Sequence, residues 1–146
     1  MKLTIEQSLE YSDVEIKITC GLIDGRLKQL IEQIKLYSFS VMAEKDGMSV
    51  PVALEEIYYI ESVDNRVFLY KDREVYLCSK KLYELETALS ETSFVRISKS
   101  CILNTAFVSS VKAQFSGRLE ATLANNEKLL ISKHYINAVS YTHLSP

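Results

Sequence analysis

The sequence predicts a mainly β fold that carries a small α+β extension at its N-terminus. From residue 46 onward, short segments rich in Ile, Val, Leu and Tyr alternate with polar turns, which is the pattern of antiparallel strands. Only two longer stretches place apolar residues at helical spacing. The chain has 146 residues, 47% of them apolar, which suffices for one core or for one domain with an appendage.

The first 45 residues are predicted to form the α+β extension. Residues 2–7 and 14–18 alternate polar and apolar side chains, as half-buried strands do. Asp24 is a candidate helix N-cap, and the helix should run to about residue 36 with an apolar face of Leu27, Leu30, Ile31 and Ile34. A further strand is predicted over residues 38–43.

A turn signal at Asp46-Gly47 marks the predicted end of this extension. The chain then divides into an extension (1–45) with a role in regulation or oligomerisation, a main domain (46–139) and a tail (140–146). The tail is polar and ends in Pro146, so we expect it to be frayed.

In the main domain, strands over residues 56–62, 67–70 and 74–78 are joined by tight polar turns and predict an antiparallel meander. Leu82, Leu85 and Leu89 predict a short helix. Further strands are expected over residues 94–97, 108–113, 119–123 and 129–131, with turns at 116–117 and 125–126. Ser132 is a candidate N-cap for a final helical turn that begins at Lys133.

The residues that would carry enzyme chemistry are missing from the pattern. The four glycines cannot form a phosphate-binding loop, and the two histidines match no metal-binding spacing. Three cysteines without CxxC spacing argue against a disulfide framework and a zinc site. We therefore expect a protein that is not an enzyme and that holds no cofactor, metal or small-molecule substrate.

Two further features concern location. No stretch approaches 18 consecutive apolar residues, and the N-terminus has no apolar run behind a basic start. Together with the cysteine usage, this favours a reducing, cytoplasmic location.

Charge is unevenly distributed along the chain. The overall net charge of −2 does not by itself predict nucleic-acid binding. Residues 94–137, however, contain six basic and two acidic residues, a net +4, which leaves −6 for the remainder. The basic portion therefore lies toward the C-terminus.

Separated motifs in this basic portion carry the functional prediction. Residues 94–104 read FVRISKSCILN, a Phe-Ser-Gly turn follows at 115–117, and residues 130–136 read LISKHYI. Here the chain resembles the LytTR family of bacterial DNA-binding domains, whose pattern has an FxRxHxSxIVN-like strand and loop, then hairpins, then an NG…xVSRRY-like close. The matching positions are Phe94, Arg96, Ser100, Ile102 and Asn104.

The resemblance covers about residues 46–138, with two departures. Asn125-Asn126 replaces the usual Asn-Gly, and Ser132-Lys133-His134-Tyr135 replaces Ser-Arg-Arg-Tyr. The resemblance implies an elongated stack of antiparallel sheets that places inter-strand loops in successive major grooves, on direct-repeat promoter sites. The whole chain would then be a sequence-specific transcription regulator, similar to small standalone members that lack a receiver domain. Candidate partners are double-stranded DNA, a second copy of the chain and a small membrane-protein antagonist.

Carried over residue by residue, the resemblance selects three places. The turn at Asp64-Asn65-Arg66 matches the first DNA-facing loop, Ser98 and Lys99 lie in the loop that leaves the Arg96 strand, and Lys133 and His134 match the C-terminal basic pair. Phosphate neutralisation is assigned to Lys99, Lys133 and Arg118, and base reading to Lys99, His134 and either Asn65 or Arg66. His134 lacks the guanidinium fork that reads guanine.

Each of these residues also has a structural interpretation. Arg96 is either a DNA contact or a structural ion-pair partner and backbone anchor. Asn65 suits a turn with positive φ, and Ser100 and Asn104 are expected to hold the loop rather than touch DNA. The tyrosines are expected to pack in the core or across strands: Tyr58, Tyr59, Tyr70, Tyr76 and Tyr83.

A different class of function stays open beside the regulator. The chain could be a protein-interaction module that keeps the β scaffold but no longer reads DNA. His134 and the pI near 5.7 favour that alternative.

Overall fold

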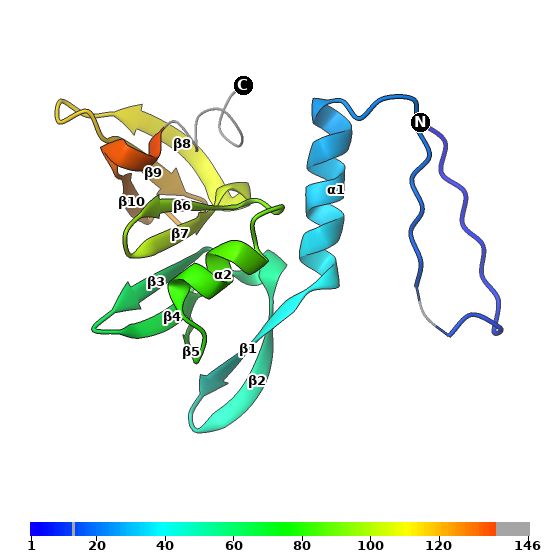
Figure 1. Cartoon of the computed structure of the whole chain (residues 1–146), viewed down its shortest axis with the longest axis horizontal. Helices are drawn as coiled ribbons and strands as arrows, with labels where there is room; N and C mark the ends of the chain where they lie inside the picture. The colour runs from blue at the N-terminus through cyan, green and yellow to red at the C-terminus, as the bar shows by residue number, and fades with distance from the viewer. Residues whose placement is uncertain (13, 137–146) are drawn as a thin grey trace.

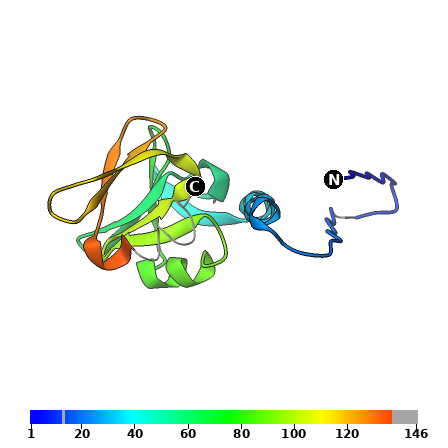
Figure 2. The ribbon, with the colours of Figure 1, turned by 90° about the horizontal axis from the view of Figure 1, so that it is seen from above.

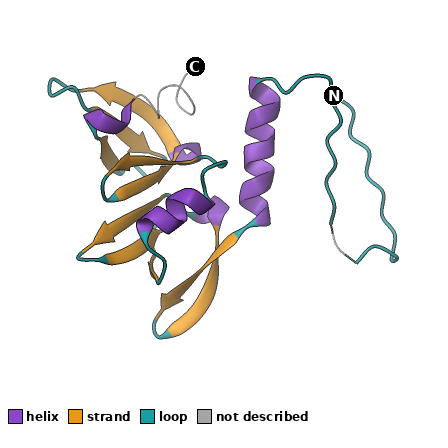
Figure 3. Ribbon diagram, viewed as in Figure 1, coloured by secondary structure: helices purple, strands orange, loops and turns teal. Residues whose placement is uncertain are grey.

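The structure is a computed structural model that describes residues 1–12 and 14–136 (Figure 1). Within these residues, the strands form a seven-stranded sheet of order β2-β1-β5-β4-β3-β7-β6 and a three-stranded sheet of order β10-β9-β8. Every pairing in both sheets is antiparallel. Figure 3 shows that strands dominate the part of the molecule from β1 onward. The predicted mainly β fold is confirmed.

Helix α1 (Gly25–Ser38) begins where the sequence predicts. The side chain of Asp24 caps it by accepting a hydrogen bond of 2.9 Å from the backbone N–H of Leu27. Leu36, in the last turn, is buried in the core, whereas the first two turns are largely exposed. Lys35 adds an ion pair of 3.0 Å to Glu91. The helix is therefore held to the sheets through its C-terminal half.

Strands β1 (Ser40–Lys45) and β2 (Met48–Ala53) form a hairpin at one edge of the large sheet. Asp46 and Gly47 form its turn with φ values of 52° and 76°, which confirms the turn signal. The predicted boundary between residues 45 and 46 thus falls inside a hairpin, and β1 also pairs with β5 in the large sheet.

The predicted meander is confirmed as β3 (Tyr59–Val63), β4 (Arg66–Tyr70) and β5 (Val75–Cys78). The first strand begins later than predicted because Leu54–Glu56 form a 3-10 turn, η1. Helix α2 (Leu82–Ala88) buries Leu82 and Leu85 in the same core as Leu69.

The three-stranded sheet packs against the edge of the large sheet that lies opposite β2. Strands β6 (Phe94–Ser98) and β7 (Cys101–Asn104) form a hairpin, and after the 3-10 turn η2 (Thr105–Phe107) come β8 (Val108–Ala113), β9 (Leu119–Leu123) and β10 (Lys128–Ile131). A 3-10 turn, η3 (Lys133–Tyr135), ends the described chain beside β6. A second core joins the layers through Ile97, Cys101, Leu103, Ala121, Leu123 and Ile131.

Strands β2 and β7 are not predicted by the sequence. All four residues of β7 are buried, so it lacks the alternation that marks a half-buried strand. Pro51 lies within β2 and argues against a strand, but β2 is an edge strand, where proline is tolerated.

The strands predicted over residues 2–7 and 14–18 are wrong for the single chain. No described residue before Gly25 belongs to a strand, and the apolar side chains of this segment are exposed. Alternation predicts a strand only where a partner strand supplies the backbone hydrogen bonds, and the described chain pairs none with it.

Two further points complete the fold. The tail predicted for residues 140–146 lies outside the described residues. Among the residues that are described, no helix has the length and apolar character needed to cross a lipid bilayer.

Candidate nucleic-acid interface

The first predicted place is the turn between β3 and β4. Asp64 and Asn65 both have positive φ, 51° and 64°, as a tight two-residue hairpin turn requires. Asn65 therefore fulfils its expected structural role. Its side chain and that of the adjacent Arg66 are exposed at the tip of the hairpin.

The second place is the turn between β6 and β7, which the Arg96 side chain holds from behind. Arg96 Nε donates a hydrogen bond of 2.7 Å to the Ser98 carbonyl, and its Nη2 donates to the Lys99 carbonyl. Its Nη1 lies 3.1 Å from Glu86 Oε1, on α2. The guanidinium is thus occupied as a backbone anchor and ion-pair partner, and its side chain is only 17% exposed.

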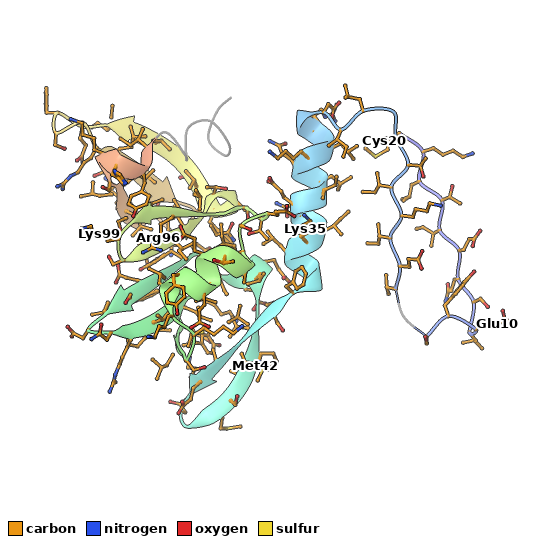
Figure 4. All side chains as sticks on the ribbon, viewed as in Figure 1. Glu10, Cys20, Lys35, Met42, Arg96 and Lys99 are labelled. Carbon is orange, nitrogen blue, oxygen red and sulfur yellow. The ribbon has the colours of Figure 1, made fainter. Side chains whose placement is uncertain are left out.

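The Lys99 side chain, in contrast, projects from this turn into solvent (Figure 4). Ser98 Oγ accepts a hydrogen bond of 3.2 Å from the Ser100 N–H, which tightens the turn. The backbone of Ser62, next to the β3–β4 turn, donates to the Ser100 carbonyl at 2.8 Å. The first two places are therefore joined by backbone.

The third place unites η3 with the turn between β8 and β9. Gly117 has φ of 83°, and its bare Cα faces the Lys133 side chain, since an added Cβ would lie 3.3 Å from Lys133 Cε. Lys133 therefore lies across the turn that contains Arg118. The N–H of Ser132, just before η3, donates to the Ile97 carbonyl on β6 at 2.8 Å. His134 is exposed and makes an edge contact with Tyr135.

These places share one side of the molecule. The β3–β4, β6–β7 and β8–β9 turns and η3 lie on the side of the sheets that faces away from α1 (Figures 1 and 2). Lys99 and Arg96 are on this side in Figure 4, whereas Lys35 is on α1. We call these four elements the turn face.

The basic residues of the C-terminal portion differ in whether their charge is neutralised. Arg96 pairs with Glu86, and Lys128 lies 3.8 Å from Glu120. Across the described ranges 1–12 and 14–136, no ion pair is formed by Lys99, Arg118 or Lys133. Lys112, exposed on β8, also forms no ion pair in these ranges, so the cations of this portion left for an external anion are the three on the turn face together with Lys112.

Behind the turn face, buried groups are held in their neutral form. Desolvation, with a contribution from Glu61, raises the pKa of the Cys101 thiol from 9.0 to about 12. Burial and the neighbouring Glu127 carboxylate raise the pKa of Tyr59, which stacks on Tyr70 at 4.4 Å between ring centroids. Tyr58 stacks on Phe107 at 3.9 Å. These tyrosines pack as expected.

Of the five tyrosines that are expected to pack, Tyr76 is buried and Tyr83 is the exception. It was expected to pack, but it is 63% exposed. It follows Leu82 on α2 and so points away from the face that Leu82 and Leu85 bury.

Asn104 is buried, and its amide holds the chain where β7 ends. It accepts hydrogen bonds from the Ser93 hydroxyl at 2.7 Å and the Ala106 N–H at 3.1 Å, and it donates to the Ile57 carbonyl at 2.9 Å. The expectation that Asn104 holds local backbone is confirmed. In the β6–β7 turn, Ser98 rather than Ser100 supplies the hydroxyl that binds backbone.

The roles of two residues of the site are not predicted by the sequence. Glu86 holds Arg96 from another element, and no local spacing in the sequence indicates this contact. Gly117 was read as a turn residue, but it also leaves room for Lys133. In the described part of the chain, no cluster of His, Cys, Asp and Glu could hold a metal ion.

A family model described as the LytTr DNA-binding domain matches residues 47–142, more than half of the chain. The chain belongs to this family. It is 28% identical over 85 residues to the sensory transduction protein LytT of Enterococcus faecalis, covering 58% of this chain and 35% of that protein. The LytT protein of Bacillus anthracis is 26% identical over 102 residues, covering 65% of this chain and 42% of that protein. The chain thus spans well under half the length of these relatives.

The fold is also that of a solved LytTr domain. The LytTr DNA-binding domain of a Bacillus cereus protein described as a methyl-accepting/DNA response regulator superposes with a TM-score of 0.68. The match has 20% sequence identity and covers 73% of this chain and 97% of the other. The LytTR-like fold that the sequence predicts is therefore confirmed.

Proposed function

We propose that this LytTR protein is a sequence-specific transcription regulator that binds double-stranded DNA with its turn face. The observation that carries the proposal is that Lys99, Arg118 and Lys133, free of ion pairs in the described chain, stand on that one face. Membership of the LytTr DNA-binding domain family supports it. A cytoplasmic location follows from binding chromosomal DNA.

The size of the turns suits the major groove. A groove about 12 Å wide admits a two-stranded hairpin end-on. In the proposed complex, Lys99 enters one major groove and donates to a phosphate or to guanine O6 and N7, while Asn65 or Arg66 approaches the neighbouring phosphates or bases.

The third place serves the next major groove along the same side of the duplex. Lys133 and Arg118 neutralise phosphates there, and His134 reaches the base edges with one donor or acceptor. Because an imidazole offers no fork, we expect the base preference at this position to be weaker than that of an arginine.

Arg96 acts in this proposal through Lys99 rather than through DNA. Three of its five guanidinium N–H donors are used, by the Ser98 and Lys99 carbonyls and by Glu86. It fixes the turn so that little side-chain and loop entropy remains to be lost when Lys99 binds.

The test is a salt titration of binding to duplex DNA from the region upstream of the protein's own gene, with scrambled duplex as competitor. We expect specific binding whose logarithmic salt dependence is steep, and we expect Lys99→Ala with Lys133→Ala to reduce the slope by about 2 units. The matched control is Lys17→Ala with Lys28→Ala, which removes the same charge from exposed positions outside the turn face.

Two results would count against the proposal. Equal effects of the two double variants would show that overall charge, not the turn face, governs binding. Absence of binding at low salt would favour the protein-interaction module instead.

A further inference from the structure

The segment before α1 exposes an unusual amount of apolar surface. We call residues 1–24 the arm. Leu3 is 84% exposed, Ile16 60% and Leu22 81%, and Ile5, Ile18 and Ile23 are also exposed. Exposed apolar surface that is contiguous along a segment marks an interaction site rather than an ordinary surface.

Helix α1 continues this surface. Leu30 is exposed, and α1 contacts the sheets chiefly through its C-terminal half. In both views the arm lies beyond α1, away from the sheets (Figures 1 and 2). The N-terminal half of α1 therefore stands between the β-sheets and the arm without being covered by either.

The arm has the alternation of a strand hairpin but does not adopt strand structure in its described residues. Its two runs go in opposite directions in Figure 1, and the turn between them includes a hydrogen bond of 3.2 Å from the Tyr11 N–H to the Ser8 carbonyl. No described residue of the arm is in a strand. An isolated two-stranded hairpin is marginal in water, whereas three or more strands packed against a helix are stable.

A second copy of the arm would bring the number of strands to four. A six-residue run spans about 20 Å in extended form, which matches the length of about 21 Å expected for the 14 residues of α1. The arm carries a net charge of −3, and Arg26 and Lys28, in the exposed half of α1, form no ion pair within the described residues, so arm and helix attract each other. Arm and helix together also offer the 20 to 30 residues per partner that a stable interface uses.

We propose that the arm and α1 form a homodimerisation element. The arms of two copies pair into a four-stranded antiparallel sheet, whose apolar face of Leu3, Ile5, Ile16 and Ile18 packs on the two α1 helices. The turn faces then remain outside the interface. This dimer does not depend on DNA binding, so the two proposals can fail separately.

Cys20 provides a probe that the chain already contains. It is exposed at the end of the arm, whereas Cys78 and Cys101 are buried. A thiol-directed dye therefore labels Cys20 selectively in the native full-length protein. Mixing donor-labelled and acceptor-labelled copies should give resonance energy transfer, and light scattering should give the mass of a dimer.

The decisive variants place equal charge on the two faces of the arm. Ile5→Glu with Ile16→Glu introduces two carboxylates on the apolar face and should raise the dimer dissociation constant about 100-fold or more. Thr4→Glu with Thr19→Glu adds the same charge to the opposite face and should change it by less than about fivefold. Thermal unfolding of the β-sheets, unchanged in both pairs, shows that each variant is folded.

Three outcomes would overturn the homodimer. The first is a wild-type protein that stays monomeric at concentrations on the order of 100 μM, with no energy transfer. The second is a monomer whose arm amides are protected from hydrogen exchange, because the arm would then cover its own helix. The third is equal weakening by the two pairs of variants, which would assign the association to charge rather than to the apolar face.

Discussion

The β-sheets and the arm use the same sequence pattern with opposite results. In β4, Val67 and Leu69 alternate with exposed or half-buried residues and are buried in the core of the large sheet. In the arm, Leu3 and Ile5 alternate in the same way and remain exposed. The difference is strand pairing: β4 has a neighbouring strand on each side, whereas no described residue of the arm belongs to a strand. Alternation thus indicates an apolar face that has to be buried. Whether a single chain can bury that face depends on which strands the fold places beside it.

The largest expected contrast comes from deleting one apolar side chain in each region. Leu69→Ala leaves a cavity in the core of the large sheet and should lower the free energy of unfolding by about 3 kcal/mol. Leu3→Ala, in the arm, should lower it by less than about 0.5 kcal/mol when measured on the monomer at low concentration. Denaturant titration of both variants measures the difference, and similar losses would break the comparison.

A buried polar side chain should matter almost as much within the β-sheets. Asn104→Ala removes the partner of the Ser93 hydroxyl and of the Ile57 carbonyl, both at buried positions, and should cost about 2 kcal/mol. Asn125→Ala is the control, since Asn125 accepts a hydrogen bond from the Glu127 N–H at an exposed turn and should cost under about 1 kcal/mol. Equal costs would mean that the Asn104 network adds no stability.

The link between α2 and the β6–β7 turn offers a test with a distinctive signature. Glu86→Gln weakens the hold on Arg96 and should lower DNA affinity about threefold to tenfold, without changing the salt slope. Glu84→Gln on the same helix is the control. A slope that becomes shallower in Arg96→Gln by about 1 unit would show that Arg96 itself contacts a phosphate, contrary to the anchoring role.

The smallest expected effect is a loss of stability at alkaline pH. The folded state raises the pKa of Cys101 from 9.0 to about 12, so it holds the thiol proton more tightly than the unfolded chain does. This contribution is complete below about pH 9 and is lost as the pH rises toward 12, amounting to about 1 kcal/mol by pH 10. The raised pKa values of Tyr59 and Tyr70 act in the same direction.

The alkaline loss of stability can be tested with one cysteine variant in the β-sheets and one in the arm. Cys101→Ala should flatten the pH dependence of the unfolding free energy between pH 8 and 10, whereas Cys20→Ala, in the exposed arm, should leave it unchanged. An unaltered profile in Cys101→Ala would assign the alkaline loss to other groups.

Local signals in the sequence were sufficient for most of the β-sheets. The Asp64-Asn65 turn, the Asp24 cap and the leucines of α2 each act within a few residues, so their consequences could be predicted without the fold. Strand β7 could not, because burial on both faces erases its alternation. The arm could not either, because its pairing depends on a partner that the sequence does not identify.

The same division applies to the turn face. The positions of Lys99, Lys133 and Arg118 on turns followed from local patterns and from the family resemblance. The sequence alone allows Arg96 to be either a DNA contact or an anchor. In the structure, Glu86 on α2 fixes the position of its guanidinium. Contacts of this kind depend on how elements pack together, so the spacing of residues within one element does not predict them.

The hydrogen bond from Ser62 to the Ser100 carbonyl has a consequence for the choice of operator. Since this backbone bond ties two neighbouring hairpins into one rigid unit, the distance between the tips of Asn65 and Lys99 does not adjust to the DNA. In the proposed complex, a base pair inserted between the positions that the two tips touch has to be absorbed by twisting or bending the duplex. Such a protein measures the spacing of its site as strictly as it reads the bases.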